Sequence, residues 1–85
     1  MDKIKINEEV VFRNLQGEAV LLNLQTGTYF GLDSMGTRIW NLIEEYGSLQ
    51  KILEKLLEES DATKEQCTKD LTDFILLLEK NNLIK

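Results

Sequence analysis

The sequence predicts an α+β protein in which three antiparallel strands are followed by three helices. Short segments rich in strand-forming residues occupy positions 10–32, whereas the apolar residues from position 34 onward recur with helical spacing. The chain has 85 residues, five glycines and no proline, and no repeat or linker-like segment divides it. Residues 1–85 are therefore expected to form a single domain around one core.

The strands are expected in the first third of the chain. Residues 10–14 have a weak pattern that is typical of an edge strand. Residues 19–25 are rich in strand formers, Thr26 and Gly27 supply a turn, and residues 28–32 return as a third strand.

A two-residue turn at Thr26 and Gly27 would set the register of this hairpin. It places Leu24 opposite Tyr29 and Leu21 opposite Leu32. Both faces of the hairpin would then carry large apolar side chains.

Three helices are expected after the strands, each marked by an apolar stripe. The first follows Asp33 or Ser34 as N-cap and ends at Gly47; its stripe is Met35, Ile39, Leu42, Ile43 and Tyr46. Ser48 caps the second, which ends near Glu59; its stripe is Leu49, Ile52, Leu53, Leu56 and Leu57. The third begins at Thr63 and runs to about Asn81; its stripe is Cys67, Leu71, Phe74, Ile75 and Leu78. Leu83 and Ile84 are expected to fold back onto the core. Three strands followed by three helices is one arrangement of a winged helix, so we expect a winged-helix-like fold.

The composition argues against an enzyme and against a metal or cofactor site. The chain has no histidine, which is the usual general base near neutral pH and a common zinc ligand. No glycine spacing fits a phosphate-binding loop. The single cysteine, Cys67, is expected to be a small buried hydrophobe of the core, and Trp40 a structural anchor between sheet and helices.

Net charge and segment lengths constrain the partners and the compartment. A formal charge of −5 has the wrong sign for a surface that neutralises phosphates, and the lysines of the third helix are offset by neighbouring acids. A winged-helix regulator that binds DNA remains the alternative reading, by analogy of fold. The chain lacks an apolar run long enough to span a membrane and an N-terminal signal pattern, so we expect a cytoplasmic protein.

The third strand is the candidate binding element. Residues Thr28, Tyr29, Phe30, Gly31 and Leu32 carry no charge, although they would form the edge of a simple three-stranded meander. Such an edge can accept an extended peptide as an added strand, and Gly31 would allow close approach. The same residues fit a second reading, in which the chain's own termini cover the edge. The uncharged edge also allows a weak dimer, so we expect a monomer or a weak dimer.

One flank of the third helix would form the second side of a peptide-binding groove beside the third strand. Gln66, Asp70, Asp73 and Leu77 project as one flank beside the core stripe, and Leu76 projects almost opposite the core. Asp70 and Asp73 would favour basic residues in a bound peptide. The pattern does not decide whether this flank or the side with Ile75 faces the third strand.

The chain resembles the PqqD-like family of precursor-peptide recognition proteins. The resemblance rests on the succession AVLLNLQTGTYFGLDSMGTRIWNLI, a glycine-terminated turn, an amphipathic helix, and a last helix ending FILLLEKNNLIK. It spans nearly the whole chain, and its most telling part is the block that ends in Gly36, Ile39 and Trp40.

This resemblance implies a non-catalytic module that binds the leader segment of a ribosomally synthesised precursor peptide. The leader would add as a strand to residues 28–32 and pack against the third helix at Gln66, Asp70, Asp73, Phe74 and Leu77. The module would then present the leader to a maturation enzyme. That enzyme would be a cysteine-protease leader peptidase, as in lasso peptide systems, or a radical enzyme, as in pyrroloquinoline quinone biosynthesis.

Overall fold

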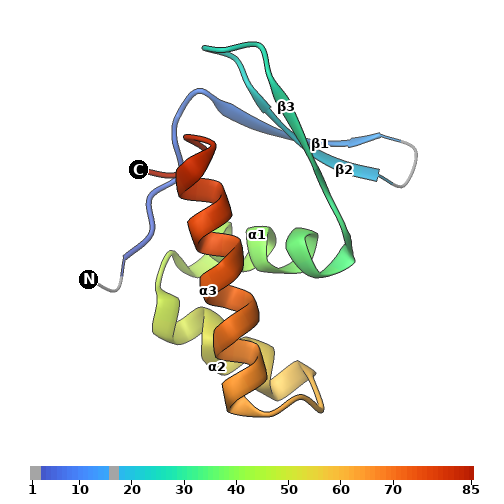
Figure 1. Ribbon diagram of the computed structural model, residues 1–85, viewed down its shortest axis with the longest axis vertical. Coiled ribbons are helices and arrows are strands. Elements are labelled where there is room, and N and C mark those ends of the chain that lie inside the picture. The colour runs from blue at the N-terminus through green and yellow to red at the C-terminus, as the bar shows by residue number, and fades with distance from the viewer. Residues whose placement is uncertain (1–2, 16–17) are drawn as a thin grey trace.

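The computed structural model describes residues 3–15 and 18–85, which form three strands followed by three helices (Figure 1). The strands are β1 (Val10–Leu15), β2 (Glu18–Asn23) and β3 (Tyr29–Leu32). The helices are α1 (Ser34–Tyr46), α2 (Leu49–Glu59) and α3 (Lys64–Lys80). This order confirms the expected α+β fold class.

The strands form one antiparallel sheet in the order β1-β2-β3. The register of the second hairpin differs from the sequence-based expectation: Tyr29 lies opposite Leu22, and Leu32 lies opposite Ala19. The prediction of a two-residue turn was therefore wrong, because β2 stops at Asn23 and the connection to β3 is longer.

Asn23 is the physical reason for the longer connection. Its side chain is 1% exposed, and its Oδ1 accepts hydrogen bonds from the amides of Gln25 (2.9 Å) and Thr26 (3.3 Å). The Gly27 amide donates to the Asn23 carbonyl at 2.8 Å, and Gly27 itself has φ 75°. An asparagine that binds the amides two and three residues ahead forms a turn of its own, in competition with a tight hairpin.

The helices begin at the expected N-caps, and α1 ends at the expected glycine. Asp33, Ser48 and Thr63 each accept a hydrogen bond from an amide in the first turn of their helix. Gly47 ends α1 in the left-handed conformation with φ 63°, and Asn82 adopts φ 57° just after α3. These local signals explain why the helix bounds agree closely with those read from the sequence.

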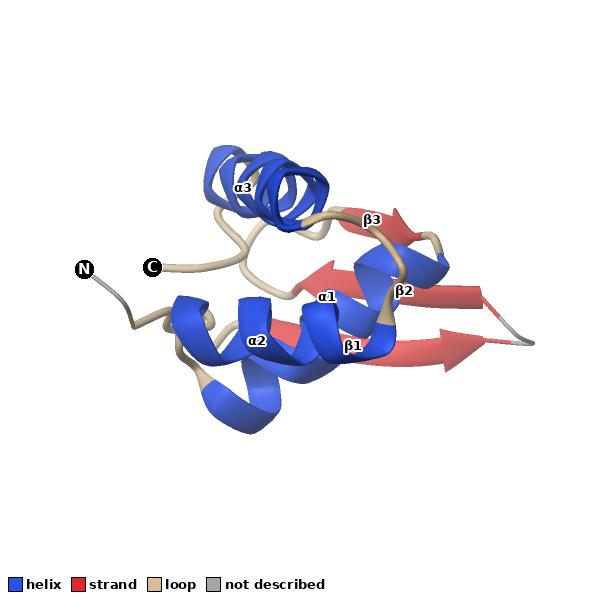
Figure 2. Cartoon of the chain, turned by 90° about the horizontal axis from the view of Figure 1, so that it is seen from below, coloured by secondary structure: helices blue, strands red, loops and turns tan. Residues whose placement is uncertain are grey.

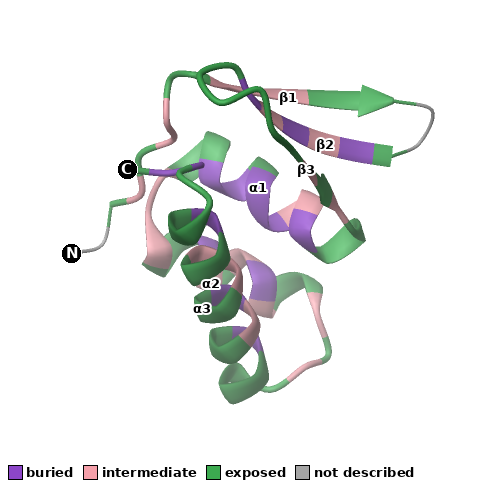
Figure 3. Cartoon of the chain, turned by 45° about the horizontal axis from the view of Figure 1, so that its top comes forward, coloured by how far each residue is buried: buried purple, intermediate pink, exposed green. Residues whose placement is uncertain are grey.

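The core lies between the inner face of the sheet and the three helices, and it includes Trp40 and Cys67 (Figure 3). Leu83 and Ile84 are also buried there, as expected. The prediction that Met35 and Tyr46 belong to the core-facing stripe of α1 was wrong, because Met35 is 44% exposed and Tyr46 is 37% exposed. Both lie in the terminal turns of α1.

The N-terminal segment from residue 3 onward and the C-terminal segment after α3 pair with each other (Figure 1). The Asn7 amide donates to the Leu83 carbonyl at 3.1 Å, and the Lys85 amide donates to the Lys5 carbonyl at 2.7 Å. Ile4 is held at the end of α1 by a 2.9 Å bond from its amide to the Gly47 carbonyl. None of the helices in the described part of the chain has the length and apolar character needed to cross a membrane.

Candidate functional site

The outer edge of β3 is unpaired in the described structure. Among residues 3–15 and 18–85, β3 pairs with β2 alone, and the terminal segments pair with each other instead of with β3. Figure 2 shows α3 on the β3 side of the sheet, away from β1. The unpaired edge therefore lies beside a helix.

The register identifies which backbone groups point outward from this edge. The Asn23 amide donates to the Thr28 carbonyl at 2.9 Å, so this pair is a hydrogen-bonded one. Opposite residues in an antiparallel pair alternate between bonded and non-bonded positions. Phe30 and Leu32 therefore direct their N–H and C=O groups toward β2, whereas Tyr29 and Gly31 direct theirs outward. These outward groups can bond an added strand.

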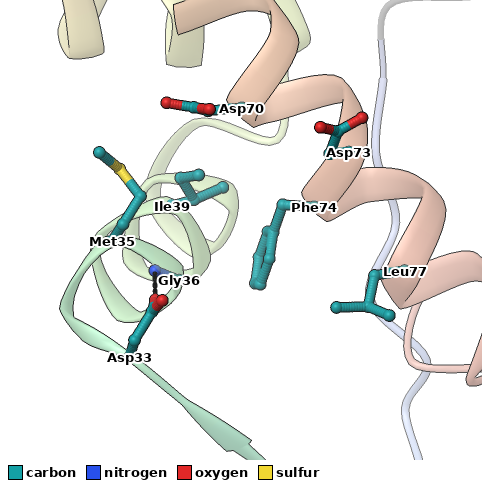
Figure 4. A pocket seen from close by; sticks show the side chains of 8 residues that line it. All are labelled: Asp33, Met35, Gly36, Ile39, Asp70, Asp73, Phe74 and Leu77. Atoms are coloured by element: carbon teal, nitrogen blue, oxygen red, sulfur yellow. Dashed lines mark hydrogen bonds between the residues drawn. The ribbon is translucent and has the colours of Figure 1, made fainter.

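A hollow of about 400 Å³, which we call the large hollow, opens between the start of α1 and α3 (Figure 4). Its floor is apolar and its rim is acidic. The lining residues are Asp33, Met35, Gly36, Ile39, Asp70, Asp73, Phe74 and Leu77.

A second hollow of about 120 Å³, the small hollow, lies next to the large one. It shares Asp33, Phe74 and Leu77 with the large hollow, and its other lining residues are Phe30, Gly31 and Leu32. The two hollows together form what we call the β3–α3 groove. This groove runs beside the outward-facing backbone of β3, so a strand added there can place side chains into it.

Three carboxylates around the groove have fixed hydrogen-bond partners. Asp33 accepts from the Gly36 amide at 2.7 Å, and Asp70 accepts from Gln66 Nε2 at 2.8 Å. Lys69 Nζ donates to Asp73 Oδ2 at 2.9 Å, and this bond raises the pKa of Lys69 above its usual value. The large hollow therefore has three carboxylates on its rim, and one of them, Asp73, is paired with the Lys69 cation at the surface.

The structure brings together seven of the ten sequence-predicted site residues in this groove. They are Phe30, Gly31, Leu32, Asp70, Asp73, Phe74 and Leu77. The flank of α3 that faces β3 is thus the one with Asp70 and Leu77, while Ile75 packs against the core.

The other three residues lie outside both hollows. The Thr28 hydroxyl pairs with that of Thr26 at 2.7 Å within the turn. Gln66 lines neither hollow, and its Nε2 donates a hydrogen bond to Asp70 Oδ1 at 2.8 Å. The Tyr29 side chain is 76% exposed on the outer face of the sheet, where it lines a separate concavity with Val20 and Leu22. Its backbone alone faces the edge.

Sequence reasoning missed the contribution of α1 to the groove. Asp33, Met35, Gly36 and Ile39 line the large hollow, although the sequence pattern placed Met35 and Ile39 in the core stripe. One signal was available. These residues follow β3 directly in the chain, so the first turn of α1 must lie near the end of that strand.

The fold and the groove define a small α+β protein with an unpaired sheet edge beside a helix. Residues 18–84 match the family described as coenzyme PQQ synthesis protein D, PqqD, and the chain belongs to this family. Comparison with curated proteins found no match.

Two solved structures are similar over nearly the whole chain. One is TbiB1 in complex with the TbiA(beta) leader peptide, with a TM-score of 0.88 and 41% identity; the match covers 95% of this chain and 94% of that one. The other is lasso peptide synthetase B1 complexed with the leader peptide, with a TM-score of 0.87 and 17% identity; 98% of each chain is covered. At 17% identity, the second match shows the fold alone.

Proposed function

We propose that this chain is a non-catalytic module that binds the leader segment of a ribosomally synthesised precursor peptide. The leader adds as a strand to the outer edge of β3, and its side chains enter the β3–α3 groove. The observation that carries this proposal is the outward backbone of Tyr29 and Gly31 next to two hollows. TbiB1, which shares 41% identity with this chain, was solved with a leader peptide, and this supports the same ligand class.

Affinity in this mode has two sources. Backbone hydrogen bonds to Tyr29 and Gly31 provide the sequence-independent part, and side chains in the hollows provide the selective part. The apolar lining of the groove includes Phe30, Leu32, Phe74 and Leu77, together with Met35 and Ile39 from α1. A few well-buried anchors carry most of the binding energy in such interfaces.

The bound leader is then delivered to a maturation enzyme. The enzyme is either a cysteine-protease leader peptidase or a radical enzyme that modifies the precursor. Reconstitution of the chain with each enzyme and its precursor distinguishes the two, because only the enzyme served is expected to turn over faster when the chain is present.

A pair of substitutions at Gly31 tests strand addition directly. Gly31→Pro removes an amide that points away from β2, and proline is tolerated at such edge positions. Gly31→Ala keeps the amide, and a Cβ built there meets no atom within 4 Å. We expect Gly31→Pro to bind the TbiA(beta) leader peptide at least about fivefold more weakly than Gly31→Ala, because a hydrogen bond is lost and the ring crowds the added strand.

The measurement is isothermal titration of both variants and the wild type with the TbiA(beta) leader peptide and with the leader of the chain's own precursor. Circular dichroism checks that both variants fold. Equal affinities of the Pro and Ala variants would contradict strand addition at β3. Absence of binding to either leader by the wild type would overturn the proposed function.

A further inference from the structure

Phe74 is the wall between the two hollows. Its side chain lines both of them, and it is half-buried. Figure 4 shows the ring pointing from α3 into the space between Gly36 and Leu77. The position of this ring therefore divides the volume of the β3–α3 groove between the large hollow and the small hollow.

Gly36 is the residue against which this ring rests. A Cβ added at Gly36 would lie 3.1 Å from Phe74 Cε1, 3.2 Å from Asp33 Oδ1 and 3.4 Å from Leu32 Cδ2. The first two contacts are tighter than ordinary van der Waals contact. Asp33 cannot readily give way, because its Oδ1 accepts the hydrogen bond from the Gly36 amide. The Phe74 ring is therefore the group expected to shift, by a few tenths of an ångström.

The backbone of α1 does not require glycine at this position. Gly36 lies in the first turn of the helix, and the positive φ values among the described glycines occur at Gly27 and Gly47. Inside a helix, glycine costs up to about 1 kcal/mol relative to alanine. The close approach of Phe74 is the structural feature that accounts for a glycine here.

We propose that Gly36 is a specificity-determining position of the β3–α3 groove. Because it lacks a Cβ, Phe74 closes against the first turn of α1, and this contact sets the relative sizes of the two hollows. Those sizes select which pair of leader side chains the groove accepts. This inference rests on the proposed leader-binding function and adds to it the residue that tunes the selection.

The direction of the effect follows from the geometry. A methyl group at Gly36 pushes the Phe74 ring away from α1, toward Leu77. The small hollow has about 120 Å³, so it has less room to lose than the large hollow with about 400 Å³. Gly36→Ala is therefore expected to reject a leader whose side chain fills the small hollow.

A double-mutant cycle between Gly36→Ala and Phe74→Leu tests the proposal. In the wild-type background, Gly36→Ala is expected to weaken binding of the TbiA(beta) leader peptide about fivefold or more. In the Phe74→Leu background the smaller side chain relieves the contact with the new Cβ. Gly36→Ala is therefore expected to weaken peptide binding less than about twofold in that background. Thermal unfolding of each variant confirms that it folds.

Leu76→Ala is the matched control on the same helix. Leu76 is 57% exposed and lines neither hollow, so Gly36→Ala and Leu76→Ala are expected to be additive. An alanine scan of the TbiA(beta) leader peptide supplies a second readout. One leader side chain is expected to fill the small hollow. Replacing that side chain by alanine is expected to weaken binding to the Gly36→Ala variant less than it weakens binding to the wild type.

The outcomes separate the two proposals. The wild type could bind leader peptide while Gly36→Ala weakens binding by the same factor in both Phe74 backgrounds. In that case the proposed role of Gly36 is wrong and leader binding stands. If the wild type binds neither leader, the proposed function and this inference both fail.

Discussion

The backbone amide of Asn7 donates to the carbonyl of Leu83 at 3.1 Å, so the N-terminal segment pairs with the C-terminal end of the chain. The sequence left open whether the termini cover β3 or leave its edge unpaired. This pairing decides between the two readings, because the N- and C-terminal segments satisfy each other's backbone groups just after the C-terminal end of α3. The outward groups of Tyr29 and Gly31 remain available for another strand.

The first prediction concerns amide hydrogen exchange along β3. In the free protein the amides of Phe30 and Leu32 are expected to be protected, because they point toward β2, while those of Tyr29 and Gly31 exchange rapidly. Saturation with the TbiA(beta) leader peptide is expected to slow exchange at Tyr29 and Gly31 by about tenfold or more. Nuclear magnetic resonance resolves the four amides individually. Protection of the Tyr29 and Gly31 amides before peptide is added would show that their edge is already occupied.

The second prediction concerns the acidic rim of the large hollow. Asp70→Lys with Asp73→Lys is expected to weaken binding of leader analogues that place a lysine near this rim. Each exposed ion pair contributes about 0.2–1 kcal/mol, so the loss of two such interactions is expected to weaken binding roughly twofold to thirtyfold at low salt. The probe is the TbiA(beta) leader peptide with one residue at a time replaced by lysine.

The control for the charge variant is Glu44→Lys with Glu54→Lys. Both glutamates are exposed, neither lines the groove, and the net charge changes by the same amount. The loss specific to Asp70 and Asp73 is expected to shrink at high salt, because screening weakens exposed charge pairs. Equal effects of the two double variants would attribute the loss to net charge alone.

The third prediction concerns Asn23, the buried residue that ends β2. Asn23→Ala leaves the amides of Gln25 and Thr26 without their side-chain acceptor, so the free energy of unfolding is expected to fall by about 1–3 kcal/mol. Urea denaturation measures the change. Asn14→Ala, on the exposed part of β1, is the control and is expected to change stability by less than about 0.5 kcal/mol. A neutral Asn23→Ala would contradict the role given to this side chain.

The fourth prediction concerns Trp40, which is 1% exposed and whose Nε1 has no hydrogen-bond partner in the described structure. Trp40→Phe removes a donor that has no bond to lose, so it is expected to cost only about 1–2 kcal/mol of stability. Trp40→Ala leaves a large cavity and is expected to cost about 3–5 kcal/mol. Chemical denaturation followed by circular dichroism measures both. Similar costs for the two variants would show that the indole ring has a role beyond filling volume.

Local signals in the sequence determined the order and the bounds of the helices. Asp33, Ser48 and Thr63 cap their helices through bonds to amides within the same turn, and Gly47 ends α1 with a positive φ that glycine adopts easily. Each of these interactions spans only a few residues, so the pattern of residue types is sufficient to predict it. The sequence pattern also indicated the third strand as an edge of the sheet, but it left open which flank of α3 lies beside that edge.

The tertiary structure alone decided the register of the hairpin, the state of the β3 edge and the contribution of α1 to the groove. The register depended on the burial of Asn23, and burial is a property of the packed chain. The unpaired state of the β3 edge depended on the terminal segments pairing with each other, through a bond between Asn7 and Leu83, which are far apart in the sequence. The closeness of Gly36 to Phe74 likewise depended on how α1 and α3 pack. Periodicity tells which residues share a face, but only packing brings two faces together.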